Sequence, residues 1–326
     1  MASIKDVARE AGVSTATVSR MMANKGYISE SARAKVEAAV KKLGYRPNRA
    51  AQQLRDQRSR ILALIVSDIQ NPFFGEICRA VEAYARKQGL CVFVCNTDEN
   101  AETEQHYLEV MAQEQVAGII ISPSSRSQKN AQALNKLGLP VVMIDRQSDS
   151  HFDAILVDNT DAAYRLTKRV IEGGYQRIAG LFGADSFTAR ERLIGFEKAL
   201  SEAGLSASQI QHIPAFEAQG RTAMTSLLQS DNPPDAVICS SALIATGAYR
   251  AIHDSGRSIP EEIGFATFDD PPWANFVSPG LTVIRQPAKL IGEAAAEFLI
   301  KRIEEPQRTP SILRLHGELI ERGSLR

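Results

Sequence analysis

The side chains that most often carry out catalysis are scattered along this sequence rather than grouped in a known motif. There is no Gly-x-Ser-x-Gly nucleophile elbow, no phosphate-binding Walker loop and no His-Glu-x-x-His metal motif. Paired carboxylates, which can do acid–base chemistry, occur at Asp269-Asp270. The five histidines have no consistent partner: His106, His151, His212, His253 and His316. These patterns favour a binding protein over an enzyme.

Four cysteines are the remaining candidates for metal or redox chemistry. Cys91 and Cys95 lie in the alternating apolar run Leu90–Cys95, which predicts a strand. No second cysteine pair and no nearby histidine completes a zinc set. We therefore expect Cys78, Cys91, Cys95 and Cys239 to be buried, reduced thiols, and we expect no metal site and no cofactor.

Charge is unevenly distributed along the 326 residues, although the formal net charge is zero. Residues 1–60 contain 13 Lys/Arg and 5 Asp/Glu, whereas the remainder contains 25 and 33. A basic N-terminal segment followed by an acidic remainder suggests that the first segment binds a polyanion such as nucleic acid. An ordinary solvated surface would also fit the charge alone.

Three short helices are predicted in the basic segment. Ser3-Ile4-Lys5-Asp6 fits a capping box, and Gly12 ends the helix that follows. Ser14 caps a second helix that runs to Met22, and a third helix runs from about Ser29 to Leu43, with Gly44 at its C′ position. Three short helices with a tight turn between the first two indicate a helix-turn-helix, which places its second helix in the major groove of DNA.

The second helix carries side chains suited to reading base edges. Arg20 can bond a guanine edge through two hydrogen bonds, and Thr15 and Ala16 can contact a thymine methyl group. A phosphate contact or a surface salt bridge is the alternative for Arg20. Tyr45 could reach a phosphate or pack on the third helix. Small hydroxyls near the helix start are expected to cap it and to bond phosphates: Ser14, Thr17 and Ser19.

After the basic segment, a short connection leads into a repeating pattern. Pro47 suits the first turn of a very short helix through about Leu54, and residues 56–60 are typical of a linker. Apolar strands and amphipathic helices then alternate, which indicates parallel sheets covered on both faces. Roughly 265 residues suffice for two such units, whose strand ends would face each other across a cleft. The predicted strands are Ile61–Val66, Leu90–Cys95, Ala117–Ile121, Val141–Ile144, Ile155–Val157, Arg177–Phe182, Ala236–Cys239 and Gly264–Phe268, and the predicted helices include Glu76–Gln88, Glu104–Glu114, Ala162–Glu172, Glu191–Ala203 and Gly220–Leu228.

Short motifs in order along the chain resemble the lactose/galactose (LacI/GalR) repressor family. The N-terminal motifs are Ile4-Lys5-Asp6-Val7-Ala8, Gly12-Val13-Ser14, Thr17-Val18-Ser19-Arg20, Val36-Glu37-Ala38-Ala39, Leu43-Gly44-Tyr45-Arg46-Pro47-Asn48 and Ala51-Gln52-Gln53-Leu54. The later motifs are Asn71-Pro72-Phe73-Phe74, Arg192-Leu193-Ile194-Gly195-Phe196, Phe268-Asp269-Asp270, Leu281-Thr282-Val283-Ile284-Arg285-Gln286-Pro287 and Leu319-Ile320-Glu321-Arg322. The N-terminal motifs are highly specific, and the later ones are individually weak but strong as an ordered set.

The resemblance implies a three-part chain. A helix-turn-helix DNA-binding domain would span 1–46, a hinge helix and linker 47–60, and an α/β core similar to periplasmic sugar-binding proteins 61–326. The core would contain two parallel-sheet subdomains joined by three crossings. Their expected bounds are about 61–157 with a return segment at 286–308, and about 158–285 with the C-terminal tail.

The resemblance also implies a role for the hinge helix. In family members this helix pairs with its twin from a second subunit in the minor groove, where the residue matching Leu54 inserts between base pairs and kinks the duplex. Ala51 lies on the same side of the helix, and Asn48 would lie near phosphates. Packing of Leu54 on the core is the alternative.

The resemblance further implies a small-molecule effector between the core subdomains, held by the residues that match the family's cleft positions. Arg192 and Asp269 are the strongest candidates for charged hydrogen bonds to ligand hydroxyls, with a structural ion pair as the alternative. Ser241 replaces an Asn that many sugar-binding relatives carry, so a ligand is not expected to lie as a plain pyranose does in them. Arg126, unless it is solvent-exposed, could help Arg192 to hold a carboxylate, which favours a sugar acid such as a gluconate or ketogluconate. The further expected cleft residues are Phe73, Asp145, Asp158, Phe216 and Gln286, with core packing as the alternative for the two aromatic rings.

The sequence thus predicts a transcriptional repressor of carbohydrate or sugar-acid metabolism genes that binds palindromic operator DNA under the control of a small effector. A homodimer is expected because one DNA-binding domain reads one half-site of the operator. No leucine-heptad helix of the kind that makes tetramers in some relatives follows the last motif. Without a signal peptide or an apolar run long enough to span a bilayer, the protein is expected in the cytoplasm and not at a membrane. The alternatives are an architectural DNA-binding protein and a sugar-modifying enzyme fused to a DNA-binding head.

Overall fold

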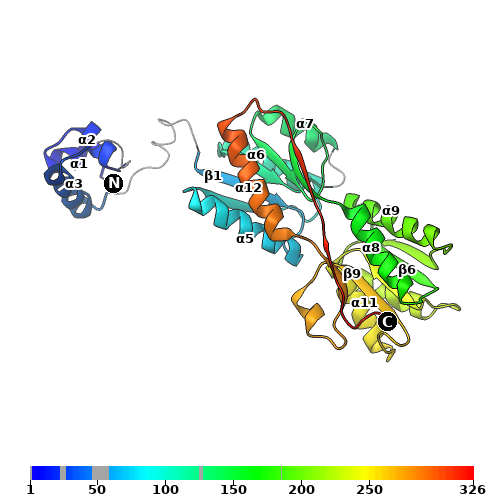
Figure 1. Ribbon diagram of the computed structural model, residues 1–326. Coiled ribbons are helices and arrows are strands. Elements are labelled where there is room, and N and C mark those ends of the chain that lie inside the picture. The colour runs from blue at the N-terminus through cyan, green and yellow to red at the C-terminus, as the bar shows by residue number, and fades with distance from the viewer. Residues whose placement is uncertain (1, 23–26, 46–58, 125–127, 185) are drawn as a thin grey trace. The chain divides into compact units, whose positions relative to one another are not determined.

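The computed structural model describes residues 2–22, 27–45, 59–124, 128–184 and 186–326 (Figure 1). The chain divides into two compact units, Met1–Ser59 and Arg60–Arg326. The first unit, called the head below, is helical where it is described, and the second, called the core, contains two six-stranded sheets.

The head follows the predicted helix-turn-helix order. Its described helices are α1 (Ile4–Ala11), α2 (Thr15–Met22) and α3 (Glu30–Leu43). The capping box at the start of α1 is formed, because the Ser3 hydroxyl accepts a hydrogen bond from the Asp6 amide and the Asp6 carboxylate accepts one from the Ser3 amide. Gly12 and Gly44 end α1 and α3 in the left-handed region, with φ of 64° and 57°. Each helix contributes one fully buried valine to the hydrophobic core of the head: Val7, Val18 and Val36.

The first sheet of the core is entirely parallel, with the strand order β11-β5-β4-β3-β1-β2. Its strands are β1 (Ile61–Val66), β2 (Cys91–Asn96), β3 (Gly118–Ile121), β4 (Val141–Ile144), β5 (Asp153–Val157) and β11 (Ile312–Leu315). Helices α5 (Pro72–Lys87) and α12 (Ala288–Glu304) lie side by side on one face, and α6 (Ala101–Gln113) and α7 (Gln128–Leu137) cover the other (Figure 1). Leu64 and Ile65 point to opposite faces of β1, and both are fully buried because helices cover both faces.

The second sheet has the order β12-β10-β9-β8-β6-β7, and its pairs are parallel except for β10 with β12. Its strands are β6 (Ile178–Gly183), β7 (Gln209–Ile213), β8 (Ala236–Cys239), β9 (Gly264–Phe268), β10 (Thr282–Arg285) and β12 (Glu318–Ile320). Helices α8 (Asn159–Glu172) and α9 (Phe187–Glu202) pack on one face, and α10 (Glu217–Leu228) and α11 (Ala242–Asp254) pack on the other. A short 3₁₀ helix, η1 (Pro272–Asn275), follows β9.

Three crossings connect the two sheets: from β5 to α8, from β10 to α12, and from β11 to β12. The expected return segment stopped at about residue 308, but the segment in the first subdomain extends further. Residues 312–315 form β11, which pairs with β5 at the edge of the first sheet. The short apolar run of β11 is half exposed, so it gives a weaker sequence signal than a buried strand.

Element boundaries differ from the predictions in a regular way. The five predicted helices of the core begin three or four residues earlier in the structure, and four of them start directly after a polar N-cap residue: Asn71, Asn100, Asp158 and Ser186. The thiol prediction is wrong for Cys91, which is exposed on the edge strand β2, and Cys78 is only partly buried. Cys95 and Cys239 are buried as expected.

Candidate functional site

Helix α2 exposes the side chains that were predicted to read base edges. Thr15, Ala16 and Arg20 are exposed, whereas Val18 on the opposite side is fully buried in the head. The buried valine fixes the rotation of α2, so the other three side chains are accessible to a partner.

The hydroxyls around the start of α2 are arranged as a cap. The Ser14 hydroxyl accepts a hydrogen bond from the Thr17 amide at 3.1 Å and lies 2.9 Å from the Thr17 hydroxyl. Thr17 and Ser19 are half-buried, and Tyr45 packs against the hydrophobic core of the head. Three further predicted DNA contacts lie outside the described residues: Asn48, Ala51 and Leu54.

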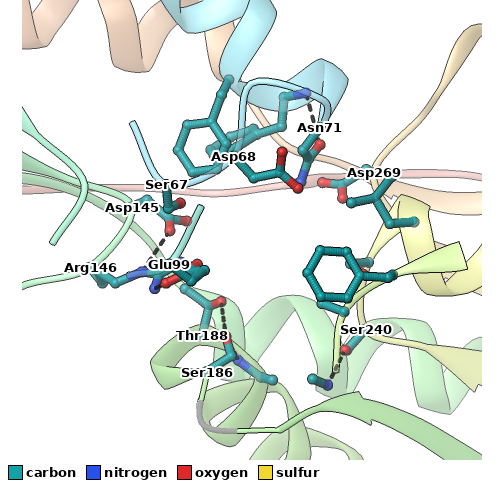
Figure 2. A pocket seen from close by; sticks show the side chains of 18 of the residues that line it. Ser67, Asp68, Asn71, Glu99, Asp145, Arg146, Ser186, Thr188, Ser240 and Asp269 are labelled. Atoms are coloured by element: carbon teal, nitrogen blue, oxygen red, sulfur yellow. Dashed lines mark hydrogen bonds and ion pairs between the residues drawn. The ribbon is translucent and has the colours of Figure 1, made fainter. Parts of the chain in front are cut away.

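The core contains a pocket with a volume of about 350 Å³ between its two sheets (Figure 2). Many of its residues follow the carboxyl ends of parallel strands, the edge at which open α/β sheets bind ligands. Seven of the predicted effector residues line this pocket: Phe73, Asp145, Arg192, Phe216, Ser241, Asp269 and Gln286.

Two predicted effector residues are not part of the described pocket. Arg126 lies outside the described residues. Asp158 does not line the pocket, because its carboxylate turns back to cap α8 and accepts a hydrogen bond from the Asp161 amide at 2.9 Å. An aspartate after a strand is equally suited to capping the next helix, and the sequence does not distinguish the two roles.

The wall formed by the first subdomain contains an ion-pair network that the sequence did not predict. Arg146 donates two hydrogen bonds to the Glu99 carboxylate, at 2.8 and 2.9 Å, and one to Asp145 at 3.0 Å (Figure 2). The pKa of the Arg146 guanidinium is raised: burial lowers it, but the charges of Asp145 and Glu99 outweigh burial. The dipeptide Asp145-Arg146 at the end of β4 was the available signal, but it does not name Glu99 as the partner.

Arg192 is the corresponding cation of the second subdomain, and it is only 4% exposed. Its Nε donates to Asn159 at 2.8 Å, one terminal nitrogen donates to the Ser240 carbonyl at 2.5 Å, and its guanidinium lies 4.0 Å from the centre of the Phe268 ring. Burial lowers the pKa of Arg192, and the nearby charges of Asp269 and Asp145 oppose that shift. Because a guanidinium stays charged in proteins, Arg192 brings a buried positive charge to the pocket.

Asp269 and Gln286 form a further polar contact in the pocket. Asp269 accepts a hydrogen bond from the Gln286 amide at 2.6 Å and another from the Ala242 backbone at 3.1 Å. The Oε1 atom of Gln286 is buried and has no hydrogen-bond partner among the described residues, and the same holds for the hydroxyl of Ser67. Both residues line the pocket, so both can bind a polar group of a ligand.

The remaining predicted residues frame the pocket. Phe73 is buried and packs edge-to-face against Phe74, so it serves the hydrophobic core and the pocket together. Phe216 precedes α10 and remains 55% exposed, which leaves an aromatic face for a ligand. Ser241 caps α11 through a hydrogen bond from the Ile244 amide.

Carboxylates outnumber cations in the pocket lining. Asp68, Asp98, Glu99, Asp145 and Asp269 line it, against Arg146 and Arg192. Burial raises the pKa of Asp68, and the negative charges of Asp98 and Glu99 raise it further. Four of the five acids have positive φ, a costly conformation for residues other than glycine that is typical of functional sites: Asp98, Glu99, Asp145 and Asp269.

Within the described ranges, no group of three or more His, Cys, Asp or Glu side chains could hold a metal ion. The helices of those ranges also include none with the length and apolar character needed to cross a bilayer.

Comparisons with known proteins cover nearly the whole chain. Residues 3–48 match the family described as bacterial regulatory proteins, lacI family, and residues 59–319 match the family of periplasmic binding proteins and sugar binding domain of LacI family. A ribose operon repressor of Halalkalibacterium halodurans is 37% identical over 94% of this chain and 91% of its own length. An HTH-type transcriptional repressor PurR of Aliivibrio salmonicida is 34% identical over 100% of this chain and 99% of its own length.

Solved structures agree with these matches. The lac repressor dimer bound to operator and the anti-inducer ONPF superposes with a TM-score of 0.90, at 27% identity over 99% of this chain and 98% of that one. The regulator CelR in complex with cellobiose gives a TM-score of 0.76, at 28% identity over 99% and 100% of the two chains. The predicted fold class, a helical head with two parallel-sheet α/β subdomains, is confirmed. The chain belongs to the LacI family of DNA-binding repressors and carries that family's effector-binding domain.

Proposed function

We propose that this repressor controls genes of sugar metabolism and that its effector is a neutral, hydroxyl-rich metabolite about the size of a monosaccharide. The observation that carries the proposal is that Arg192 and Asp269 line one pocket of about 350 Å³, together with polar atoms of Gln286 and Ser67 that have no partner among the described residues. Sugar hydroxyls both donate and accept hydrogen bonds, so they match these groups, and the volume lies near the lower end for small-molecule sites.

The charge of the lining favours a neutral ligand over the sugar acid that the sequence suggested. Five carboxylates line the pocket and only two guanidinium groups oppose them. Arg146 already donates to Glu99 and Asp145, and Arg126, on which the preference for an acid partly rested, lies outside the described residues. An anionic ligand would therefore add charge to a site that already holds an excess of negative charge.

Ribose is the first ligand to test, because one relative is a ribose operon repressor and an Enterococcus faecium LacI-family regulator was solved with bound ribose. Thermal unfolding of the full chain should be measured with D-ribose, cellobiose, D-gluconate, 2-keto-D-gluconate and hypoxanthine. A ligand at 100 times its Kd stabilises the native state by about 2.7 kcal/mol, which should raise the Tm by about 5 °C or more. A shift with a neutral sugar supports the proposal, and a shift with the two sugar acids alone contradicts it.

The same proposal implies that the protein binds its effector and does not convert it chemically. Both carboxylate oxygens of Asp269 already accept hydrogen bonds, from Gln286 and from the Ala242 amide, so Asp269 is placed to hold a ligand rather than to exchange protons. Conversion of the stabilising ligand, followed by chromatography over hours, would instead favour an enzyme. Operator affinity that no ligand alters would favour an architectural DNA-binding protein.

We further propose a homodimer on palindromic operator DNA in the bacterial cytoplasm, where such DNA lies. One head reads one half-site, so two heads are needed for a palindrome. The edge strand β2 leaves Phe93 and Val94 42% and 44% exposed, and exposed apolar side chains on a strand edge favour pairing with another copy. Light scattering at micromolar concentration should give the mass of a dimer, and the mass of a monomer would contradict this assembly.

A further inference from the structure

Two charged residues of the pocket are each held by a buried amide side chain at a crossing between the sheets. Arg192 donates through Nε to Asn159, which is the first residue of α8 after the crossing from β5. Asp269 accepts from Gln286, which follows β10 at the crossing into α12. The connections that link the two subdomains therefore also hold the two charges that the proposed effector would meet.

The amide of Asn159 is fixed in one orientation by its own hydrogen bonds. Asn159 is 1% exposed and does not line the pocket. Its oxygen accepts from Arg192 at 2.8 Å, and its nitrogen donates to the Glu191 carboxylate at 3.0 Å and to the Val157 carbonyl at 3.4 Å. With the acceptor and both donor hydrogens in use, the amide cannot turn without losing contacts on both sides of the crossing.

This fixed amide determines which part of Arg192 faces the pocket. Asn159 holds Nε, the Ser240 carbonyl holds one terminal nitrogen, and the Phe268 ring lies against the guanidinium. The second terminal nitrogen has no hydrogen-bond partner within the described part of the chain, so it is the donor left for a ligand.

The position of Asn159 also links Arg192 to movement of the subdomains. The pocket is lined from both sheets, and the three crossings are the covalent connections between them. Any change in their separation must be absorbed by backbone rotation at these crossings, as in other hinged proteins. Rotation at the first crossing would move Asn159 and, through its hydrogen bond, the guanidinium of Arg192.

We propose that Asn159 is a positioning residue for effector binding, which makes the orientation of Arg192 depend on the first crossing. The inference rests on the proposed function, because it takes Arg192 as an effector contact. Asn159 lies outside the pocket, yet on this proposal it contributes to ligand affinity. It also couples ligand binding to movement of the subdomains.

The test is a double-mutant cycle with D-ribose as the probe, measured by calorimetry on the full chain. Asn159→Ala should raise the Kd for D-ribose about tenfold, because Arg192 would no longer be held in position for its charge-assisted hydrogen bond to the ligand. Arg192→Ala should raise it further, and the double variant should bind no more weakly than Arg192→Ala alone, because Asn159 acts only through Arg192. The matched control is Thr167→Ala, a buried residue of the same helix whose hydroxyl donates to the Ala163 carbonyl, and its Kd should stay at the wild-type value.

Two results would overturn the proposal. One is a Kd of Asn159→Ala within twofold of wild type, and the other is an additive loss in the double variant, which would indicate a general structural role. A crystal structure of Asn159→Ala supplies a readout that needs no ligand: a displaced Arg192 guanidinium supports the proposal, and an unmoved one contradicts it. If the wild-type protein fails to bind ribose, ribose is excluded as its effector, and the crystal structure still decides the role of Asn159.

Discussion

At the scale of single residues, the two buried arginines of the pocket differ in what their hydrogen bonds leave available. Arg146 is held through both terminal nitrogens and Nε by Glu99 and Asp145, which makes it part of the wall. Arg192 is anchored by Asn159 and Ser240 and retains a terminal nitrogen for a ligand. The same residue type therefore supports the pocket wall in one subdomain and, in the other, keeps a donor that we propose for the effector.

Replacing Arg192 with Ala should weaken effector binding by roughly 30-fold or more, because a lost charged hydrogen bond in a buried site costs about 2–5 kcal/mol. Operator binding without effector should stay near the wild-type value, since the head is unchanged. Arg190→Ala is the matched control, because Arg190 is exposed on the same helix and contacts Phe187 rather than the pocket. Calorimetry with the effector checks this prediction, and equal losses in the two variants would remove Arg192 from the effector site.

Replacing Arg20 with Ala should have the opposite effect. Discrimination between the operator and a scrambled duplex should fall by about tenfold or more, the value of one bidentate contact to a base, while effector affinity is unaltered. Arg9→Ala, an exposed arginine on α1, is the control for charge alone. Fluorescence anisotropy at fixed salt measures both, and a uniform loss on the two duplexes would instead indicate a phosphate contact.

The sequence predicted the pocket residues whose motifs are local, such as Phe73, Arg192 and Asp269. It missed Glu99, because the contact with Arg146 forms only when loops 47 residues apart in the chain meet. It misassigned Asp158, because a carboxylate after a strand can face a cleft or cap the next helix. Side-chain direction is set by packing, which spacing alone does not reveal.

At the scale of elements, a close helix contact explains the glycine in the motif that contains Arg192. A Cβ added at Gly195 on α9 would lie 2.1 Å from the backbone oxygen of Thr160 on α8. The two helices therefore depend on glycine at this point of contact. The motif Arg192-Leu193-Ile194-Gly195-Phe196 combines a proposed ligand contact with this packing requirement.

Gly195→Ala should lower the free energy of unfolding by about 1–3 kcal/mol, because backbone must move to admit the methyl group. Gly75→Ala on α5 is the matched control, since nothing lies within 4 Å of its added Cβ. The control should be neutral or stabilising by up to about 1 kcal/mol, as alanine favours helix. Urea unfolding measures both, and equal stability of the two variants would mean that α8 and α9 can separate without cost.

Asp270, shortly after β9, links the end of β10 and the C-terminal tail. Its carboxylate accepts hydrogen bonds from Arg322 in the C-terminal tail and from Arg285 at the end of β10. Burial raises the pKa of Asp270, but these two arginines outweigh burial and hold the pKa below its usual 3.8. The ionised form of Asp270 therefore stabilises the folded core.

A depressed folded-state pKa gives stability that is present above pH 3.8 and is lost as the pH falls through the folded value. Asp270→Asn should lower the free energy of unfolding at pH 7 by about 2–3 kcal/mol. The difference between wild type and variant should shrink below pH 3.8, because the wild-type carboxyl becomes neutral too. Urea unfolding from pH 7 to pH 3 checks this, and a difference that does not change with pH would exclude Asp270 as the titrating group.

Alternation of apolar strands with helices predicted eight strands of the two sheets, because buried parallel strands read as continuous apolar runs. Four predicted strands, β1, β4, β8 and β9, have the same bounds in the structure. Strands β7, β10, β11 and β12 were not predicted as strands. For β11 the reason is that an edge strand with exposed Ile312 lacks that signal. Cys91 was misjudged for the same reason, since the sequence does not say that β2 lies at an edge.

At the scale of the whole molecule, the charge differs between the N-terminal residues and the rest of the chain, as expected for one part that binds DNA and another that binds a small molecule. The first 60 residues carry the excess of Lys and Arg suited to phosphates, and the remainder carries the excess of Asp and Glu. The pocket shares the acidic character of the remainder. This acidic lining is the reason for proposing a neutral effector.

Coupling between these two tasks is best tested by measuring operator affinity with and without the ligand that stabilises the protein. Anisotropy of a labelled operator, selected in vitro from random duplexes, should show a change in Kd of about 5- to 150-fold at saturating ligand, the usual range of allosteric coupling. The ligand should bind the operator complex with its own affinity changed by the same factor. In Arg192→Ala, the ligand concentration that gives half of this change in operator Kd should rise by about 30-fold or more, in line with its weaker effector binding. A wild-type operator Kd that stays constant at saturating ligand would contradict control of DNA binding through this pocket.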